Sequence, residues 1–323
     1  MKSALLPSAG SLGDLRETLL AWYDANRRDL PWRRNHDPYL VWLSEVMLQQ
    51  TRVAAVVEHY RRFLERFPTL QKLARAREAS VLTAWSGLGY YRRARMLHAA
   101  AKKIVREHEG NFPASAQRLR ELPGIGRYTS AAIASIAFGE AVAVVDGNVE
   151  RVLQRVAGKE LSEKTAWHMA ETLLDPQRPG DFNQAMMELG ALVCLPRQPM
   201  CLACPLLEWC LTRGEARKAK KEVRHKREVY YVLSRRNGSV LLTQRSADAS
   251  LMPGMWELPE IAGCASHPQF TLRHSITGTD YTVRVVERAQ SHGTRGEWME
   301  KSRLSRLPLT GLARKILRRA QVF

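Results

Sequence analysis

Long apolar segments are missing from this 323-residue sequence. No uninterrupted apolar run reaches the ~18 residues that a membrane-spanning helix needs, which argues against a membrane bundle. The first residues, MKSALLPSAGSLGD, contain one lysine and a short apolar pair, so we expect no signal peptide. Because hydrophobic residues make up 45% of the sequence, a disordered or collagen-like chain is also excluded.

Acidic residues are in short supply as well. The sequence has 32 Asp and Glu against 50 Lys and Arg, a net charge of +18. This excess favours a polyanionic partner, either nucleic acid or an anionic membrane surface. The alternative is that the charge serves only to keep the protein soluble. Only five cysteines are present. Without an export signal they predict a reducing, cytoplasmic environment, where clustered cysteines bind metals rather than form disulfides.

Helical periodicity dominates the first two thirds of the chain, and the length predicts about two domains at roughly 150 residues each. Asp14 and Glu17 predict a capping box at the start of the first helix, and Asp37 with Pro38 predicts the start of the second. Because no strand pattern precedes residue 229, an all-α domain is expected over 1–212. Its helices are predicted at 14–26, 39–50, 53–66, 78–86, 92–107, 115–121, 127–138, 148–157, 162–174 and 182–193.

The composition changes at 213–228, where eight of the sixteen residues are Lys or Arg. We interpret this stretch as a solvated linker. Beyond it apolar residues alternate with polar ones, and Asn237-Gly238 between two such runs predicts a β-hairpin. An α+β domain is therefore expected over 229–323. Its elements are predicted as strands at 229–233, 240–243, 271–277 and 281–286 and a basic helix at 310–320 capped by Thr310.

Four of the cysteines, Cys194, Cys201, Cys204 and Cys210, fall within 17 residues with the spacing C-x6-C-x2-C-x5-C. Four thiolates on one short loop fit either a zinc ion or a 4Fe–4S cluster. Zinc sites usually present two close pairs, and here only Cys201 and Cys204 form one, so the spacing favours the iron–sulfur cluster. Cys264 stands alone and is predicted to be a core residue.

The segment LPGIGRYT at 122–129 lies between two predicted helices. Pro123 ends the first helix, and Gly124 and Gly126 permit a tight turn directly before the second. The backbone N–H groups of such a turn, with the N-terminus of the following helix, form a cradle for an anion. The turn predicts either the hairpin of a helix-hairpin-helix motif, which binds DNA phosphates without reading sequence, or an ordinary connection between two helices.

Two carboxyl groups stand out by their surroundings. Glu45 lies in the middle of a predicted helix among apolar residues, where burial would raise its pKa toward the range of a general acid. The alternative is a surface glutamate. Asp146 precedes the helix over 148–157 and is either only its N-cap or a carboxylate that stabilises a cationic transition state.

Taken together, the basic charge, the hairpin, an aspartate about twenty residues later and the four-cysteine loop resemble a known superfamily. It is the endonuclease III superfamily of helix-hairpin-helix DNA glycosylases with an iron–sulfur cluster. Within it the sequence is most similar to the MutY family of adenine DNA glycosylases. The resemblance covers 14–212 and implies a two-lobed helical fold with one 4Fe–4S cluster. It rests on LPWR (30–33), WLSEVMLQQT (42–51), GLGYYRRA (87–94), LPGIGRYTSAAI (122–133), VDGNVERV (145–152), FNQAMMELGALVC (182–194) and the cysteine loop.

The resemblance implies the removal of adenine mispaired with 8-oxoguanine or guanine in double-stranded DNA, after the adenine has left the base stack. It assigns to Glu45 the protonation of adenine N7 and the later activation of the incoming water. It assigns to Asp146 the stabilisation of the oxocarbenium-like sugar, either electrostatically or through a transient covalent bond. Tyr128 and Asn148 match positions that support Asp146 and the water network. Endonuclease III itself carries a nucleophilic lysine where Tyr128 stands. Because a phenol forms no Schiff base, we expect base removal without efficient strand cleavage.

Other residues match family positions that contact the substrate or the DNA. Gln50 and Tyr90 match residues that enter the duplex beside the mispair, although Tyr90 could equally be a core aromatic. The hairpin glycines Gly124 and Gly126 match the phosphate contact. The positions of the adenine pocket are matched by Arg28, Trp32, Arg33, Leu48 and Gln184, and contacts to the orphaned purine by Thr51, Leu88 and Gly89.

The region over 229–323 resembles the degenerate Nudix-like domain of the same family through its early hairpin and PGMWELPE at 253–260. The acidic helix motif of a Nudix pyrophosphatase is missing from the sequence, so we expect no nucleotide hydrolysis. In the family a Phe-Ser-His loop reads 8-oxoguanine. Ile276, Thr277 and Gly278 stand at the matching positions, which leaves Thr277 as the expected hydrogen-bond donor.

Two other functions remain open at this point. One is an endonuclease III-like glycosylase for oxidised pyrimidines, which Tyr128 and the C-terminal region argue against. The other is a non-catalytic DNA-binding iron–sulfur protein. In each case we expect a monomer that binds DNA, has no membrane partner and is located in the cytoplasm with the bacterial nucleoid.

Overall fold

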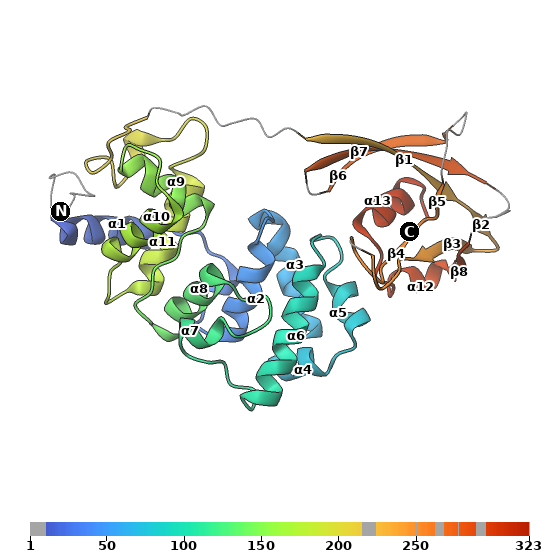
Figure 1. Cartoon of the computed structure of the whole chain (residues 1–323), viewed down its shortest axis with the longest axis horizontal. Helices are drawn as coiled ribbons and strands as arrows, with labels where there is room; N and C mark the ends of the chain where they lie inside the picture. Colours follow the sequence, from blue (N-terminus) through green and yellow to red (C-terminus); the bar gives the residue numbers. More distant parts are fainter. Residues whose placement is uncertain are drawn as a thin grey trace. The chain divides into compact units, whose positions relative to one another are not determined.

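The computed structural model describes residues 11–214, 224–249, 251–261, 268–276, 278–288 and 295–322. The chain divides into two compact units, which Figure 1 shows as ribbons. Unit 1 comprises Met1–Tyr60, Thr69–Ala74 and Ala99–Ala219, and unit 2 comprises Arg61–Pro68, Arg75–His98 and Lys220–Phe323. Unit 2 therefore combines C-terminal residues with helical segments from the first hundred residues. The domain boundaries predicted at 212 and 229 stay a prediction.

Residues 11–214 contain helices and turns but no strand, which confirms the predicted all-α character of this part of the chain. None of the described helices is long and apolar enough to cross a membrane. The α-helices are α1 (Leu12–Asn26), α2 (Pro38–Leu48), α3 (Val53–Arg66), α4 (Leu70–Arg75), α5 (Glu78–Ala84), α6 (Arg92–Glu107), α7 (Ala116–Leu119), α8 (Arg127–Phe138), α9 (Gly147–Val156), α10 (Glu163–Leu173) and α11 (Pro179–Leu192), with short 3-10 turns η1 (Pro31–Arg33) and η2 (Cys201–Ala203).

Most predicted helices are confirmed, and the differences lie at their ends. Helix α1 begins earlier than expected because Ser11, not Asp14, is its N-cap; the Asp14 carboxylate accepts from the Ser11 N–H at 2.7 Å and so closes the capping box that we had assigned to Glu17. Asp37 caps α2 as predicted. That helix ends at Leu48, two residues early, since Gln50 has a left-handed backbone with φ +54°. The short α4 was missed because six residues show too little periodicity.

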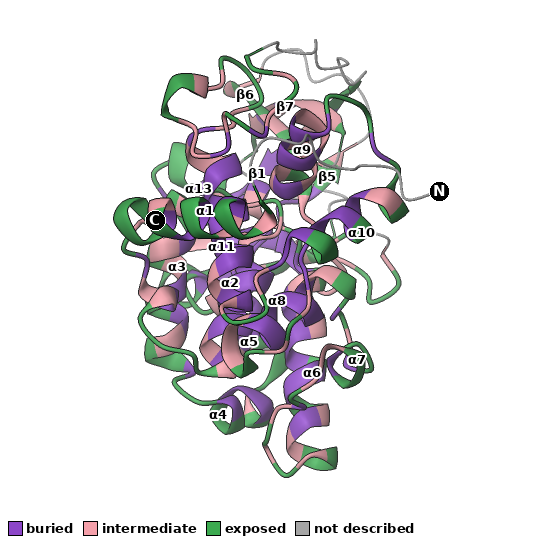
Figure 2. Cartoon of the chain, turned by 90° about the vertical axis from the view of Figure 1, so that its left-hand side faces the viewer, coloured by how far each residue is buried: buried purple, intermediate pink, exposed green. Residues whose placement is uncertain are grey.

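Helix α11 lies at the centre of unit 1, where its buried side chains join those of α1, α8, α9 and α10 in one apolar core (Figure 2). Two glycines let it approach its neighbours closely. A Cβ on Gly180 would lie 2.7 Å from the Ser135 carbonyl oxygen of α8, and a Cβ on Gly190 would lie 2.7 Å from the Asn148 Cβ of α9. These contacts bring α8 and α9, which carry candidate site residues, against one scaffold helix.

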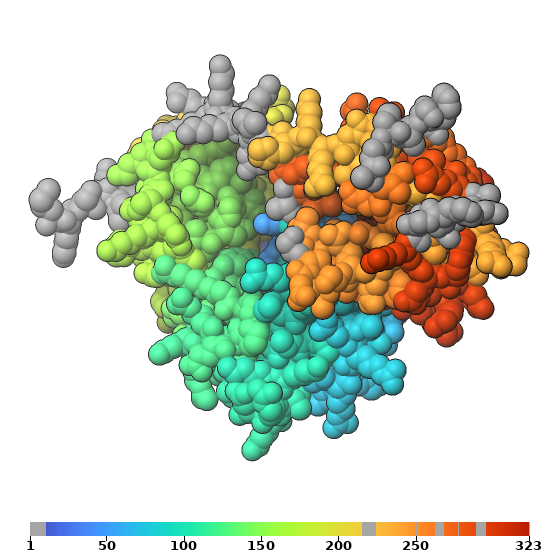
Figure 3. All heavy atoms as spheres, turned by 45° about the vertical axis from the view of Figure 1, so that its right-hand side comes forward, coloured from blue at the N-terminus to red at the C-terminus, as the bar shows by residue number. Residues whose placement is uncertain are grey.

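The C-terminal part of unit 2 contains two four-stranded sheets around an apolar core closed by a basic helix. The first sheet has the order β5-β1-β7-β6, and the second has β2-β3-β4 with β8 on β3. In Figure 3 these elements, orange to red, form one closely packed body. They are β1 (His225–Leu233), β2 (Arg235–Arg236), β3 (Ser239–Gln244), β4 (Trp256–Glu257), β5 (Glu260–Ile261), β6 (Phe270–Ile276), β7 (Thr279–Glu287), β8 (Glu297–Glu300), α12 (Lys301–Leu304) and α13 (Gly311–Arg319).

The local predictions for this region hold better than the long-range ones. Asn237 and Gly238 form the predicted hairpin turn with φ +46° and +73°, the hairpin of β6 and β7 is confirmed, and Thr310 caps α13. The turn, however, joins β2 to β3, while β1 pairs in parallel with β7. Strand β1 also begins at His225, inside the stretch predicted as linker. The sequence pattern does not reveal this start, because the first four residues of the strand are polar and exposed. Residues 215–223 of that linker lie outside the described residues.

Candidate active site

The buried carboxyl group of Glu45 lies in the middle of α2, as its apolar neighbours predicted. Only 6% of the residue is exposed. The Tyr128 hydroxyl, from the first turn of α8, donates its hydrogen bond to Glu45 Oε2 at 2.7 Å, and its oxygen also lies 3.1 Å from the Met187 sulfur. Burial raises the pKa of Glu45 to about 7; the Tyr128 hydrogen bond opposes this rise and the negative charge of Asp146 adds to it. Glu45 is therefore an acid that keeps its proton close to neutral pH.

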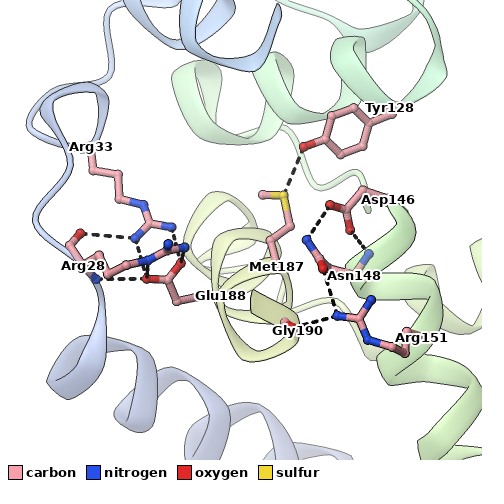
Figure 4. Close-up of polar contacts among 9 residues, drawn as sticks. All are labelled: Arg28, Arg33, Tyr128, Asp146, Asn148, Arg151, Met187, Glu188 and Gly190. Atoms are coloured by element: carbon pink, nitrogen blue, oxygen red, sulfur yellow. Dashed lines mark hydrogen bonds and ion pairs between the residues drawn. The ribbon is translucent and has the colours of Figure 1, made fainter. Parts of the chain in front are cut away.

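Asp146 is the N-cap of α9, and the hydrogen bonds that cap the helix also fix the orientation of its carboxylate (Figure 4). Oδ1 accepts from the backbone N–H groups of Asn148 and Val149 at 2.9 and 2.8 Å, and Oδ2 accepts from Asn148 Nδ2 at 3.2 Å. The N-cap interpretation is confirmed and does not exclude a chemical role, because the residue is only half-buried. The electrostatic effect of Asp146 on Glu45 shows that the two carboxyl groups share one region of unit 1.

Asn183 of α11 holds the segment that leads into Asp146, and our sequence analysis missed it. Its Oδ1 accepts from the Val144 N–H at 3.1 Å, and its Nδ2 donates to the Val142 carbonyl at 2.8 Å and to Ser135 Oγ at 2.9 Å. The side chain is fully buried. The available signal was an amide residue inside the mostly apolar run FNQAMMELGALVC, since a buried amide there must find backbone partners.

Two residues of the predicted adenine pocket, Arg28 and Arg33, converge on Glu188 (Figure 4). Arg28 Nη2 lies 2.6 Å and Arg33 Nη2 lies 2.9 Å from Glu188 Oε2, and both arginines also donate to Oε1. Glu188 is 1% exposed. Although burial raises its pKa, the hydrogen bonds from the two arginines lower it to about 2. In the sequence, Glu188 lies inside FNQAMMELGALVC, where no neighbouring residue indicates its role.

The other predicted pocket residues lie on η1, α2 and α11, which also carry Arg33, Glu45 and Glu188. Trp32 is buried with its ring edge-on to Tyr60, the ring centroids 5.3 Å apart. Gln184 is buried four residues before Glu188, so both side chains leave the same face of α11. Leu48 ends α2, the helix that carries Glu45, and is half-buried. Arg33 lowers the pKa of Glu45, which places the Arg–Glu188 cluster within electrostatic reach of the acid.

The turn before α8 has the geometry that an anion cradle needs. Gly124 adopts φ +76°, a conformation that favours glycine. Gly126 is the N-cap of α8 and has no side chain, so no side-chain hydrogen bond caps the first turn of that helix. Both glycines are exposed, while Ile125 between them is buried and anchors the turn. The Ile125 N–H already donates to the Leu122 carbonyl at 3.2 Å, so the donors that this turn offers a phosphate are those of Gly126 and the first turn of α8.

The residues expected to enter the duplex are exposed in left-handed turns. Tyr90 is 46% exposed, which excludes the core-aromatic alternative, and it has φ +48°. Gly89 before it has φ +71°, whereas Leu88 is buried. In unit 1, Gln50 is exposed with φ +54°, and the Thr51 hydroxyl donates to the Gln49 carbonyl at 3.2 Å.

All four cysteines of the loop after α11 are free thiols and half-buried. Burial, with repulsion from Cys194 and Cys210, raises the pKa of Cys201 and also that of Cys204, to about 11. The thiols therefore lie within electrostatic reach of one another. Among the described residues, no three His, Cys, Asp or Glu side chains converge closely enough for a single metal ion. Thr277 and Cys264 fall outside the described residues, so their predicted roles stay predictions.

A chain of hydrogen bonds links the cysteine loop to Asp146, and Figure 4 shows its part from Arg151 through Asn148 to Asp146. Arg151 of α9 donates from Nε to the Cys194 carbonyl at 2.9 Å and from Nη2 to Asn148 Oδ1 at 2.9 Å, and Asn148 in turn donates to Asp146. Arg151 Nη2 also donates to the Gly190 carbonyl at 2.7 Å. Asn148, which the sequence placed beside Asp146, is therefore held from both sides.

We expect Gly190→Ala to destabilise the fold by about 1–3 kcal/mol, because the new Cβ is forced against its neighbours. It would lie 2.7 Å from the Asn148 Cβ and 3.0 Å from the Asn148 carbonyl oxygen. Gly147→Ala is the matched control, since a Cβ there meets no atom within 4 Å. Chemical denaturation of both variants measures the effect. Equal stability of the two would show that α9 and α11 separate without cost.

Comparison with known proteins places this site in a family. Residues 43–176, which include Glu45, Tyr128 and Asp146, match the family model of the HhH-GPD superfamily base excision DNA repair proteins. The chain is 51% identical over 213 residues to the human adenine DNA glycosylase, covering 61% of this chain but only 39% of that longer protein. It is 36% identical over 241 residues to the adenine DNA glycosylase of Buchnera aphidicola subsp. Baizongia pistaciae, covering 71% of this chain and 69% of that one.

The helical part also matches a solved structure of a thermostable thymine-DNA glycosylase. The TM-score is 0.59 and the sequence identity 30%, over 62% of this chain and 96% of that chain. The chain belongs to the HhH-GPD superfamily of base excision DNA repair proteins and, within it, to the adenine DNA glycosylases.

Proposed function

We propose that this protein hydrolyses the N-glycosidic bond of adenine that is mispaired with 8-oxoguanine or guanine in double-stranded DNA. The observation that carries the proposal is the pair of carboxyl groups in unit 1. Glu45 is buried and holds its proton to about pH 7, while Asp146 is half-buried and oriented by three hydrogen bonds. One protonated and one oriented carboxyl group are what acid-assisted cleavage of a glycosidic bond requires.

The two carboxyl groups divide the mechanism between them. Glu45 donates its proton to N7 of the flipped adenine, which makes the base a better leaving group, and the resulting carboxylate accepts a proton from the water that attacks the sugar. Asp146 stabilises the positive charge that develops on the sugar, and its orientation is fixed before the reaction begins. Asn148 and Arg151 act as positioning residues for that carboxylate. The Tyr128 hydroxyl holds Glu45 in place. Because a tyrosine has no amine, this position cannot form a Schiff base with the sugar.

The protein is proposed to bind DNA as a monomer through the exposed turn at Gly124–Gly126, the projecting Tyr90 and Gln50, and its basic surface. The net charge of +18 supports strong, salt-sensitive attraction to phosphates. We further propose that the C-terminal sheets form a Nudix-like module whose β6–β7 hairpin faces 8-oxoguanine. Ile276 ends β6 at that hairpin, so aliphatic contact takes the place of a family phenylalanine.

We propose that Cys194, Cys201, Cys204 and Cys210 hold a 4Fe–4S cluster. Each thiolate of such a cluster binds a different iron, so the sulfurs lie farther apart than around one ion. The uneven spacing of these cysteines, in which only Cys201 and Cys204 form a close pair, supports this choice over zinc. The buried indole N–H of Trp209, inside the loop, has no hydrogen-bond partner among the described residues, which leaves a donor for a sulfur ligand. When bound, the cluster would cross-link the loop that anchors Arg151.

The test is single-turnover release of adenine at physiological salt from duplexes that place A opposite 8-oxoguanine, G, C or T. Alkali reveals the abasic sites. We expect release opposite 8-oxoguanine and G and little opposite T, and the ratio of the first two rates measures what the altered β6–β7 hairpin still reads. A protein that binds these duplexes but releases no adenine would overturn the proposal, and oxidised pyrimidines and mispaired thymine would be the next substrates.

We expect Tyr128→Lys to add strand cleavage, because a lysine amine can attack the sugar carbon and form a Schiff base. Tyr128→Phe is the control, since it removes the same hydroxyl without supplying an amine. Nicking on a gel run without alkali, and trapping of a covalent adduct by borohydride, measure the gain. Equal nicking by the two variants would mean that the side chain at this position does not reach the sugar.

A further inference from the structure

The segment from Gly87 to Tyr90 has positive φ at three of its four residues, and only at Tyr90 is this conformation disfavoured, because glycine adopts it freely. Gly87, Gly89 and Tyr90 have φ values of +109°, +71° and +48°. A non-glycine residue in the left-handed region costs about 1–2 kcal/mol, so neighbouring contacts must hold Tyr90 there. The ring is nevertheless 46% exposed, so those contacts come only from its protein-facing side.

Arg93, in the first turn of α6, supplies contacts on the protein-facing side of Tyr90. Its guanidinium carbon lies 5.4 Å from the centroid of the Tyr90 ring and 5.4 Å from that of the buried Trp85 ring. Its Nη2 donates to the carbonyl oxygens of Leu88 at 3.2 Å and Gly89 at 3.4 Å. The Trp85 indole N–H donates to the same Gly89 carbonyl at 3.1 Å. One side chain therefore stacks on the exposed tyrosine and also holds the turn that carries it.

We propose that Arg93 is a positioning residue that holds Tyr90 in its projecting conformation, so that the ring is ordered before it enters the duplex. The inference rests on the proposed function, in which Tyr90 enters the DNA beside the mispair. A planar guanidinium both stacks on aromatic rings and donates in a fixed direction, which a lysine ammonium does not do. A side chain that becomes ordered on binding loses conformational entropy. Because the Tyr90 ring is already ordered in the free protein, the binding step does not carry that cost.

The alternative role for Arg93 is a direct phosphate contact. Its Nη2 donates instead to carbonyl groups of its own turn, and burial lowers its pKa to about 10, which still leaves it charged at neutral pH. The adjacent Arg92 is exposed. Arg92→Ala therefore removes the same formal charge one residue away without touching the stack, which makes it a matched control.

A double-mutant cycle tests the proposal. The unaltered protein, Arg93→Ala, Tyr90→Ala and the double variant are compared by their Kd for a duplex with A opposite 8-oxoguanine and for the matched duplex, with melting temperatures as the folding control. We expect Arg93→Ala to weaken mispair binding roughly tenfold more than matched binding, the size of lost stacking and hydrogen bonds. In the Tyr90→Ala background, Arg93→Ala should change the ratio of the two Kd values less than about twofold. The double-mutant cycle isolates the interaction between the two side chains, and without the tyrosine that interaction is absent.

Two further variants sharpen the result. Arg93→Lys should behave like Arg93→Ala although it keeps the charge, while Arg92→Ala should weaken both duplexes equally. Equal effects of Arg93→Ala with and without Tyr90 would overturn the proposal, as would full rescue by lysine. If Tyr90→Ala leaves mispair selectivity unchanged, the inference fails while adenine release by the unaltered protein still reports the glycosylase function. If that release is absent, the proposed function fails while the binding cycle still reports on Arg93.

Discussion

Asp146→Asn is expected to lower the rate of adenine release by roughly 10³-fold while leaving the fold and DNA binding intact. The amide has nearly the same shape but no charge to stabilise a cationic sugar. Asparagine is as good an N-cap as aspartate, and its side-chain oxygen can accept the same bonds from the Asn148 and Val149 N–H groups. The variant loses the acceptor of the Asn148 Nδ2 bond, which is worth about 0.5–1.5 kcal/mol, so most of a 10³-fold loss should still fall on the chemical step.

Single-turnover release and duplex binding, measured on the same protein, separate the two roles of Asp146. Asp37→Asn is the matched control, because Asp37 caps α2 in the same way but is exposed. We expect that control to retain the full rate. A rate within tenfold of the unaltered protein for Asp146→Asn would reduce Asp146 to a cap, and a parallel loss of DNA binding would point to a structural defect.

Glu45→Gln is expected to lower release by about 10²–10⁴-fold, because an amide has no acidic proton to give to the base. Glutamine keeps the size of the side chain and an oxygen that can accept from the Tyr128 hydroxyl. In the unaltered protein the rate should fall as pH rises above about 7, where Glu45 loses its proton. The residual rate of the variant should lack this titration, and a variant that keeps it would show that another group is the acid.

The same substitution should stabilise the protein at alkaline pH. Burial raises the pKa of Glu45 from 4.5 to about 7, so its contribution to stability is complete below pH 4.5 and is lost as pH rises through 7. Above that pH, Glu45→Gln should gain up to about 3 kcal/mol in the free energy of unfolding. Denaturant titrations across this range measure the gain. Opposite signs for activity and stability would identify Glu45 as a strained functional acid, and a loss of stability at high pH would contradict its burial cost.

Helices were predictable where a few neighbouring residues decide the structure. The expected bounds of α3, α6 and α8 agree with those observed, because apolar residues at helical spacing define each segment locally. The hairpin turn at Asn237-Gly238 was predictable for the same reason, since the turn type depends on two residues. The partner of β1 was not, because nothing in its sequence distinguishes a neighbouring strand from β7, some fifty residues further along.

The sequence by itself determined the basic charge, the cysteine spacing, the tight turn at Gly124–Gly126 and the phenol of Tyr128 in place of an amine. Each is a property of one residue or of residues a few positions apart. Only the tertiary structure decided that Glu45 is buried against a tyrosine 83 positions away, and that Glu188 accepts from arginines 155 and 160 positions away. Burial and long-range hydrogen bonds exist only after helices have packed, and they alone set the pKa values on which the proposed chemistry depends.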